Sequence, residues 1–335
     1  MTKVLLTGIG GFIGSHTLEQ ILLTTDWDVV GIASWTHMGT PERVEEVLSG
    51  NPEWKKRVEI ITHDLVAPLP PRTMKRIGYV DYIINVAAES HVDRSIEDPV
   101  PFVLNNVHLS LNMLEYARVI HPKVFLQIST DEVYGVAPEG VNHKEWSAIV
   151  PSNPYSASKA CQEAISIAYW RTYGVPVVIT NTMNNFGEMQ DSEKYMAKII
   201  KCIASGETVP VHGTPEKIGS RYYLHARNHA DALLYIIKNL PPTMYKEGVD
   251  LVPDRYNVVG DVELNNLEVL KEIAEVVGKE PKYAFSDFHA TRPGHDRRYA
   301  LDGSKLKNLG WKAPVPFKES LKKYVDWTLN HPLWR

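Results

Sequence analysis

Short apolar runs alternate with longer amphipathic stretches through the first half of the chain. The runs are rich in Val, Ile and Leu and show almost no polar alternation, as expected for parallel strands covered on both faces. Strands are predicted at 3–7, 28–33, 58–61, 82–87, 124–129 and 176–180, with helices between them, for example at 12–24, 99–119 and 153–173. This order predicts an α/β fold with a Rossmann-type, doubly wound parallel sheet.

The pattern changes after Asn181, where Pro and Gly become frequent. Short strands are predicted in "VPVHG" and "RYNVVG", and helices at 193–205, 228–239, 265–278 and 317–330. We therefore predict a Rossmann domain at 1–180 and a smaller C-terminal α/β lobe at 181–335. Parts of 228–260 are expected to return to the first sheet.

Length and charge narrow the class of partner. A chain of 335 residues with 44% hydrophobic content can bury a large core and exceeds the usual size of one domain. A formal charge of −4 and a pI near 6.4 give no drive toward nucleic acid or anionic membranes. No apolar run approaches the roughly 20 residues that span a bilayer, and the N-terminus is too short in apolar residues for a secretory signal. We expect a cytoplasmic protein with a small-molecule partner.

The two cysteines, Cys161 and Cys202, have neither the spacing of a zinc site nor that of a redox pair. We interpret them as two buried thiols in a reducing cytosol. No metal site is predicted.

A glycine motif, "TGIGGFIG", lies between the first strand and the first helix. Gly8, Gly11 and Gly14 permit a tight turn and a close approach of backbone N–H groups to a pyrophosphate at the positive end of the helix. Because a strand precedes the motif and a helix follows it, we predict a dinucleotide site that also includes Phe12 and Ile13.

The choice between NAD and NADP stays open from the residues alone. The second strand ends in Ala33 and Ser34, where an acidic residue would favour NAD. Ser34, His37 or Arg43 could accommodate a 2′-phosphate, yet no arginine follows the strand directly. Asp64, after the third strand, is placed to meet the adenine amino group. The predicted cofactor site is completed by Leu65, Ala87 and Ala88.

Tyr155 and Lys159 lie four residues apart in "NPYSASKA" and therefore share one face of a predicted helix. An ammonium group beside a phenol stabilises the phenolate and lowers its pKa. Tyr155 could then take a proton from a sugar hydroxyl while the adjacent carbon gives a hydride to a nicotinamide. The preceding strand ends in Ser129 and Thr130.

These motifs together resemble the extended short-chain dehydrogenase/reductase superfamily. Within it, the stretches "AAESHVDRSI" (87–96), "STDEVYG" (129–135), "PYSASKA" (154–160), "NNFG" (184–187) and "RPGHDRRYA" (292–300) resemble the nucleotide-sugar 4,6-dehydratases that act on dTDP-glucose. The most specific piece is the Asp131–Glu132 pair, because epimerases and decarboxylases of this superfamily tend to have small or hydroxylated residues there.

Dehydration at C6 of a hexose needs a base for the C5 proton and an acid for the departing C6 hydroxyl. The resemblance implies that Glu132 is the C5 base, that Asp131 is the C6 acid, and that Thr130 hydrogen-bonds the C4 oxygen near Tyr155. In isolation, an Asp-Glu pair at this place would be a simple cap at the start of a loop.

The resemblance also implies a nucleotide-sugar-binding role for the second lobe. Ser90 and His91 are expected near the nicotinamide and the sugar, and Arg221 and Arg292 are suited to clamp phosphate. His295 could equally be a turn residue. The full predicted substrate-binding set is Ser90, His91, Asn185, Glu193, Lys194, Arg221, Asn257, Arg292 and His295.

The resemblance leaves several points open. This chain has "NNFGEMQDSEK" and "GSRYYLHARNHA" where the family pattern differs, so the nucleotide could be dTDP, UDP or another. NAD is the predicted cofactor, with NADP as the alternative, and relatives pair two long helices per subunit, which predicts a homodimer through 99–119 and 153–173. The alternatives are a nucleotide-sugar epimerase or decarboxylase, and a non-catalytic nucleotide-sugar or dinucleotide sensor.

Overall fold

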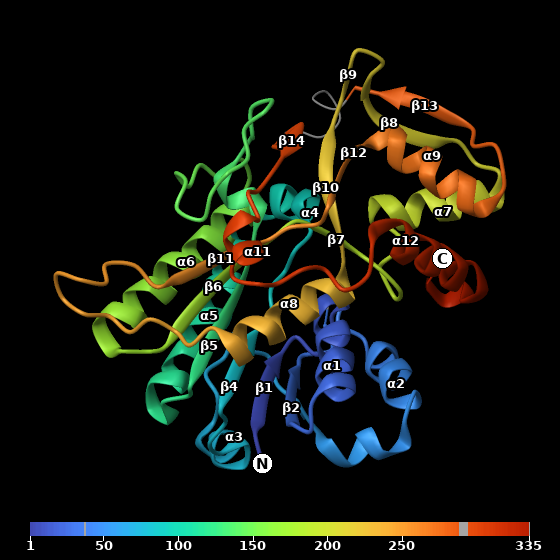
Figure 1. Cartoon of the computed structure of the whole chain (residues 1–335). Coiled ribbons are helices and arrows are strands. Elements are labelled where there is room, and N and C mark those ends of the chain that lie inside the picture. The colour runs from blue at the N-terminus through green and yellow to red at the C-terminus, as the bar shows by residue number, and fades with distance from the viewer. Residues whose placement is uncertain (37, 288–293, 335) are drawn as a thin grey trace.

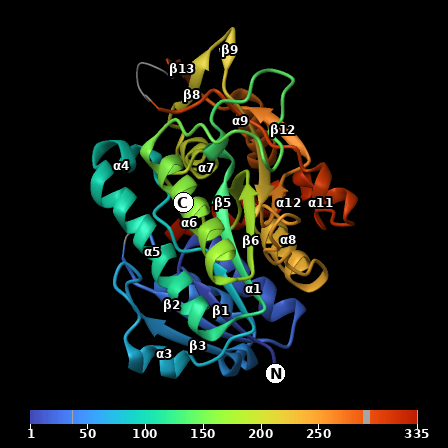
Figure 2. The same cartoon turned by 90° about the vertical axis from the view of Figure 1, so that its left-hand side faces the viewer.

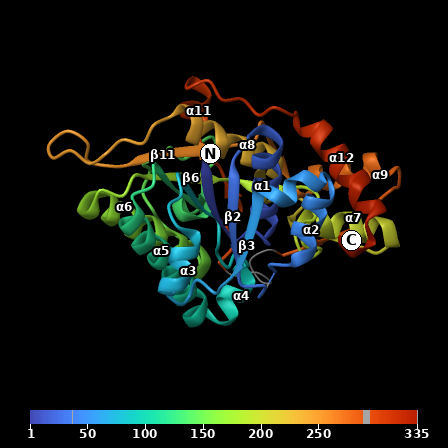
Figure 3. The ribbon, with the colours of Figure 1, turned by 90° about the horizontal axis from the view of Figure 1, so that it is seen from below.

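A seven-stranded parallel sheet forms the centre of the molecule (Figures 1 and 3). The computed structural model describes residues 1–36, 38–287 and 294–334. The sheet order is β11-β6-β5-β4-β1-β2-β3, and each neighbouring pair is parallel. The strands are β1 (Lys3–Thr7), β2 (Asp28–Ala33), β3 (Val58–Thr62), β4 (Tyr82–Asn85), β5 (Val124–Thr130), β6 (Val177–Thr182) and β11 (Asp254–Val258). The predicted fold class is confirmed.

Helices cover both faces of this sheet, which explains why its strands carry so few polar residues (Figure 3). One face packs against α1 (Phe12–Thr24), α2 (Pro41–Ser49) and α8 (Ala226–Asn239). The other packs against α3 (Pro71–Ile77), α5 (Pro99–Ile120) and α6 (Pro154–Tyr173). Every residue of β5 and of β6 is buried, so polar side chains at their ends must find partners inside the protein.

A smaller lobe lies beyond the carboxyl edge of the sheet (Figure 1). Its helices α7 (Tyr195–Ser205), α9 (Asn266–Val277) and α12 (Phe317–Asn330) share one hydrophobic core. Two small sheets accompany them, with the strands β7 (Asn184–Phe186), β10 (Ser220–His225), β12 (Val262–Asn265) and β14 (Arg298–Tyr299) in one, and β8 (Val209–Thr214), β9 (Lys217–Ile218) and β13 (Tyr283–Ser286) in the other. The remaining elements are η1 (Pro52–Arg57), α4 (Val92–Glu97), η2 (Asp131–Tyr134), α11 (Ser304–Asn308) and η3 (Pro332–Trp334).

The chain crosses between the two parts more than once. After β10 it returns as α8, which packs against α1, and then as β11, which pairs with β6 at the edge of the large sheet. Part of 228–260 therefore lies in the first sheet, as expected. The domain limits at 1–180 and 181–335 stay a prediction.

The expectation of two buried thiols is wrong for one of them. Cys202 is buried, but Cys161 is exposed. The buried stripe of α6 contains Lys159, Gln162 and Glu163, and Cys161 lies between them on the outer side of the helix. Within the described part of the chain, no helix combines the length and the apolar character that crossing a membrane requires.

A buried ion pair fastens α6 to the edge strand β11. The Nη2 atom of Arg255 lies 2.7 Å from Oε2 of Glu163, and both side chains are fully buried. Oε1 of Glu163 accepts a hydrogen bond from Asn181 Nδ2 (2.8 Å), while Arg255 donates to the carbonyl of Glu145 (3.1 Å) and lies over the Trp146 ring. These contacts fix the position of the helix that carries Tyr155 relative to the sheet.

We expect Glu163→Ala to lower the free energy of unfolding by about 3–5 kcal/mol, because it leaves the buried Arg255 guanidinium without its counter-charge. Urea denaturation measures the change. The matched control is Glu53→Ala, which breaks the exposed Glu53–Lys56 pair and should cost less than about 1 kcal/mol. Equal losses from both substitutions would show that the buried pair does not fasten α6.

Candidate active site

A cleft of about 420 Å³ lies between the carboxyl edge of the large sheet and the smaller lobe. Loops after β1, β2, β4, β5 and β6 line it on one side, and residues 182–185, 190–191 and 193–196 line it toward the smaller lobe. The carboxyl edge of a parallel sheet is where α/β proteins bind ligands, because successive loops converge there.

The glycine turn after β1 leaves no room for side chains. Gly8 has a φ of +67°, and a Cβ added to Gly14 would lie 2.0 Å from the carbonyl oxygen of Gly8. Gly11 precedes α1 as a cap without a side chain, so backbone N–H groups of the first turn, at Phe12 and Ile13, are left for a ligand. All five residues line the cleft, and the turn fits the pyrophosphate of a dinucleotide.

The other residues predicted for the cofactor site also lie at the cleft. Ser34, Asp64, Ala87 and Ala88 line it, and Leu65 lines a small recess beside it. Oδ1 of Asp64 accepts a hydrogen bond from the backbone N–H of Val66 (3.0 Å), which orients the carboxylate. Their contacts with a cofactor stay predictions.

Arg43 is fully buried and does not line the cleft. Its Nη2 lies 2.6 Å from Oδ1 of Asp191, its Nε donates to the carbonyl of Met189 (3.0 Å), and the Trp334 ring lies 4.9 Å from the guanidinium. The hypothesis that Arg43 accommodates a 2′-phosphate is therefore wrong. His37, another candidate for a 2′-phosphate, lies outside the described residues.

Two carboxyl groups lie at the end of β5, where η2 begins. Asp131 is only 3% exposed, and its Oδ1 accepts a hydrogen bond from the Thr130 hydroxyl (2.9 Å). Burial, together with the charge of Glu132, raises the pKa of Asp131 to about 7. A group with that pKa holds a proton through much of the neutral range and can donate it.

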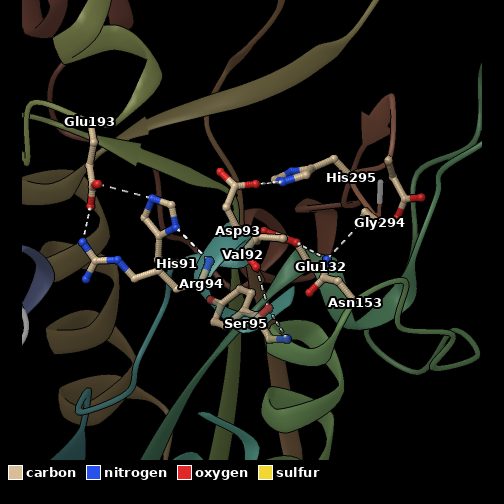
Figure 4. A network of polar contacts seen from close by, with 12 residues as sticks. His91, Val92, Asp93, Arg94, Ser95, Glu132, Asn153, Glu193, Gly294 and His295 are labelled. Atoms are coloured by element: carbon tan, nitrogen blue, oxygen red, sulfur yellow. Dashed lines mark hydrogen bonds and ion pairs between the residues drawn. The ribbon is translucent and has the colours of Figure 1, made fainter. Parts of the chain in front are cut away.

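Glu132 has a different environment from its neighbour. Burial raises its pKa, but Oε2 accepts hydrogen bonds from Asn153 Nδ2 (3.2 Å) and from the Tyr299 hydroxyl (3.4 Å). Both donors favour the ionised form. Figure 4 shows Asn153 beside Glu132, with the turn at Gly294 on its other side.

Tyr155 and Lys159 both line the cleft from α6, as their spacing predicts. Nζ of Lys159 donates to the carbonyl of Ile128 (2.7 Å) and to Oε1 of Gln162 (2.6 Å), and burial lowers the pKa of the lysine to about 8. The prediction that Lys159 lowers the pKa of Tyr155 is not met in this arrangement. Burial and the charge of Glu132 raise the phenol pKa, while a hydrogen bond with Thr130 lowers it in part.

Five predicted substrate-binding residues line the cleft, namely Ser90, His91, Asn185, Glu193 and Lys194. Across the cleft from the smaller lobe, Glu193 lies 3.6 Å from Nε2 of His91 and 3.5 Å from Nη2 of Arg94 (Figure 4). Burial and the Lys194 ammonium both lower the pKa of His91. This end of the cleft is therefore polar and rich in charged groups.

Three other predicted substrate-binding residues do not line the cleft. Asn257 is fully buried, and its amide donates to the carbonyls of His143 (3.0 Å) and Asp302 (3.1 Å), so it connects loops instead. His295 pairs with Asp93 at 2.8 Å (Figure 4). These contacts correct the assignment of Asn257 and His295 to the substrate site.

Arg221 is the third. Its guanidinium donates to the carbonyls of Asp296 (2.5 Å) and Arg297 (2.6 Å) and lies over the Tyr299 ring. Its charge still lowers the pKa of both Asp131 and Glu132, so it acts on the carboxyl groups from behind the cleft wall. Arg292 lies outside the described residues.

Sequence reasoning missed several residues of the site. Trp35, Phe102, Gln190 and Tyr223 line the cleft, and Tyr299 contacts Glu132 without lining it. Apolar and aromatic side chains of this kind carry no local signal that separates a cleft from a core. Trp35 has a positive φ of 56°, but backbone angles cannot be read from sequence. No group of three or more His, Cys, Asp or Glu side chains suited to a metal ion occurs within the described ranges.

The parallel sheet, the glycine turn and the paired Tyr155 and Lys159 define an enzyme of the extended short-chain dehydrogenase/reductase type. The chain belongs to the GDP-mannose 4,6 dehydratase family, whose model matches residues 5–324. The predicted resemblance to nucleotide-sugar 4,6-dehydratases is thereby confirmed.

Individual known proteins of this kind match this chain over nearly their full length. dTDP-glucose 4,6-dehydratase 1 of Escherichia coli is 35% identical, over 99% of this chain and 94% of the relative. The structure of dTDP-glucose 4,6-dehydratase from Bacillus anthracis in complex with NAD has a TM-score of 0.83 at 27% identity and covers 100% of this chain and 98% of that one. A UDP-glucose 4-epimerase from Thermus thermophilus, also in complex with NAD, has a TM-score of 0.82 at 28% identity and covers 98% of this chain and 100% of that one. The fold alone therefore does not separate dehydration from epimerisation.

Because the pKa of Asp131 is raised, replacing its carboxyl group should increase the stability of the protein by an amount that depends on pH. Between about pH 4 and pH 7 the folded protein holds a proton that the unfolded chain has lost, so wild-type stability falls as pH rises through this window. Asp131→Asn should therefore gain roughly a few degrees in Tm relative to wild type between about pH 5 and pH 8, measured by calorimetry.

The control for this prediction is Asp81→Asn. Burial opposes ionisation of Asp81, but hydrogen bonds from the Lys3 N–H and the Lys123 side chain outweigh it and lower the carboxyl pKa. Because Asp81 is ionised in both states above about pH 5, the Tm difference of this variant should not change across the window. A pH-independent difference for Asp131→Asn as well would contradict the raised pKa.

Proposed function

We propose that this chain converts a nucleotide-linked hexose to its 4-keto-6-deoxy product and water, with NAD as a bound cofactor that is reduced and reoxidised within one turnover. The observation that carries the proposal is the pair of the buried Asp131 and the half-buried Glu132 at the end of β5, in the same cleft as Tyr155 and Lys159. An acid and a base beside the tyrosine are what elimination requires and what a simple oxidation at C4 does not.

The residues around the glycine turn support NAD. When bound, NAD would accept a hydride from C4 and return it to C6. Of the described residues around the adenosine end of the cleft, from Gly8 to Gly14, from Ala33 to Gly39 and at Asp64, none is Lys or Arg. A 2′-phosphate would find no cationic partner among them, and this supports NAD over NADP.

The proposed chemistry assigns one proton to each side chain. Tyr155, as phenolate, takes the proton of the C4 hydroxyl. Burial and the charge of Glu132 oppose the phenolate, and the Thr130 hydrogen bond offsets part of this effect. The resulting ketone acidifies the C5 hydrogen, which Glu132 removes. Asp131 gives its proton to the C6 hydroxyl, which leaves as water. Glu132 then returns its proton to C5 as the hydride returns to C6.

The environments of the two carboxyl groups support this division of roles. Glu132 accepts hydrogen bonds from both Asn153 and Tyr299, and these stabilise its ionised form. Asp131 is the more deeply buried, and its burial and the charge of Glu132 favour its protonated form and outweigh the opposing hydrogen bond from Thr130. Paired groups whose surroundings differ in this way act as base and acid, respectively.

Two alternatives receive less support. A C4 epimerase or a decarboxylase has no step that needs a protonated carboxyl and a carboxylate beside Tyr155. A nucleotide-sugar or dinucleotide sensor would not need Tyr155 and Lys159 in the cleft that the glycine turn lines.

Two further proposals concern the nucleotide of the substrate and the oligomeric state of the protein. We propose a dTDP- or UDP-hexose as substrate, because relatives of this chain are named for dTDP-glucose and UDP-glucose. A homodimer through α5 and α6 is supported by their side-by-side packing and by the exposed Val100 and Leu104 on α5 (Figure 2). The cytoplasmic location stays a prediction.

Purified protein should convert dTDP-glucose or UDP-glucose to a keto product without added cofactor, because the hydride is returned in each turnover. Mass spectrometry of the denatured protein should find NAD. Finding NADP instead would overturn the cofactor choice. The proposed function would be overturned if neither sugar gave a product and the protein bound neither NAD nor NADP on titration.

Single-turnover experiments should distinguish the roles of the two carboxyl groups. They follow the absorbance of the nicotinamide and, by NMR, deuterium at C5. Glu132→Gln should still reduce the bound cofactor but should not exchange C5 hydrogen with solvent. Asp131→Asn should exchange at C5 yet eliminate about 10²–10⁴ times more slowly, as for a lost general acid. Tyr155→Phe should suppress the first hydride transfer. Normal turnover with full C5 exchange in Glu132→Gln would place the base elsewhere.

A further inference from the structure

Asn153 caps the helix that carries Tyr155. Its Oδ1 accepts a hydrogen bond from the backbone N–H of Ser156 (2.8 Å), and the Ser156 hydroxyl in turn accepts one from the backbone N–H of Asn153 (3.2 Å). This reciprocal capping box fixes the first turn of α6. Ser, Thr or Asp would satisfy the cap about as well as Asn does.

The other end of the same side chain reaches the proposed base. Nδ2 of Asn153 donates one hydrogen to Oε2 of Glu132 (3.2 Å) and the other to the carbonyl of Gly294 (3.0 Å), as Figure 4 shows. A rotated amide would direct its oxygen at a carboxylate and a carbonyl and its NH₂ group at the N–H of Ser156. The three partners therefore determine the orientation of the amide.

The turn at Gly294 keeps the amide in place. Gly294 has a φ of +81°, and a Cβ there would lie 3.4 Å from Cβ of Asn153 and 3.4 Å from the carbonyl oxygen of Ser152. Asn153 itself is only 7% exposed. A buried amide with all three hydrogen-bonding positions in use has little freedom to move away from Glu132.

We propose that Asn153 is a positioning residue, which holds the carboxylate of Glu132 in register with the helix that carries Tyr155. This inference rests on the proposed function, in which Tyr155 works at C4 and Glu132 at the neighbouring C5. Because a single amide both starts the helix and holds the base, the two groups keep a constant relation to adjacent carbons of one sugar. A cap of another residue type would keep the helix but lose this link.

The link also has an electrostatic consequence. The amide donor favours the ionised form of Glu132 and so opposes burial, which raises the pKa of this carboxyl. Other charged or titratable groups that act on Glu132 or respond to it are Asp131, Tyr155, Lys194, Arg221 and Tyr299. Since these stay in place when Asn153 is replaced, loss of the amide should move the Glu132 titration to higher pH.

The test is Asn153→Ser, studied with the cofactor that the protein carries when purified. Serine caps the helix but is too short to reach Glu132. We expect a Tm and a rate of cofactor reduction close to those of wild type. C5 exchange into solvent deuterium should slow by about tenfold below the midpoint of its pH profile, and that midpoint should move to higher pH.

A second variant of Asn153 and a control variant complete the test. Asn153→Asp retains a capping oxygen but sets a carboxylate against Glu132, so it should shift the exchange profile further in the same direction, and it carries the test if Asn153→Ser does not fold. Asn265→Ser is the matched control, because Asn265 caps α9 in a capping box with Glu268, away from the cleft. It should leave the exchange profile unchanged.

The outcomes separate this inference from the function on which it rests. Wild-type protein that reduces its cofactor but never exchanges C5 hydrogen overturns the proposed function. Wild-type exchange that is matched by Asn153→Ser in rate and in pH profile overturns only the positioning role. Cofactor reduction and C5 exchange that fall together in Asn153→Ser, with an unshifted profile, would show that Asn153 is a cap alone and would equally overturn it.

Discussion

Two adjacent carboxyl groups at the end of β5, one buried and one half-buried, are the constraint on which the rest of the site depends. An ionised carboxylate removed from water is costly unless donors surround it, and two adjacent ones repel each other as well. Asp131 meets this constraint by a raised pKa, and Glu132 meets it through the amide and hydroxyl donors beside it. The donors come from the start of α6 and from β14, so both must be in place before the pair can exist.

The scaffold secures these donors by contacts far from the cleft. The buried Glu163–Arg255 pair fastens the middle of α6 to the edge strand β11, and Asn153 fixes its start. On the opposite side, the buried Arg43–Asp191 pair links α2 to the segment that lines the cleft from the smaller lobe. Polar contacts of this kind are directional, so they define a geometry that apolar packing alone would leave looser.

The same architecture serves enzymes with different reactions, and the comparison with an epimerase of nearly equal fold similarity shows this directly. What distinguishes this chain is therefore a small set of side chains, not the sheet or the glycine turn. The carboxyl pair beside Tyr155 favours elimination, because it provides opposite proton transfers at neighbouring carbons.

The sequence by itself determined what depends on near neighbours. Apolar runs predicted the strands, glycine spacing predicted the turn, and the four-residue interval placed Tyr155 and Lys159 on one face, because each follows from local geometry. Only the tertiary structure decided which distant groups meet. In the tertiary structure, Arg43 is buried and pairs with Asp191, Asn257 lies away from the cleft, and Asn153 donates a hydrogen bond to Glu132. Those contacts join segments from different elements, and a residue type states what a side chain can bond but not which partner the fold brings within reach.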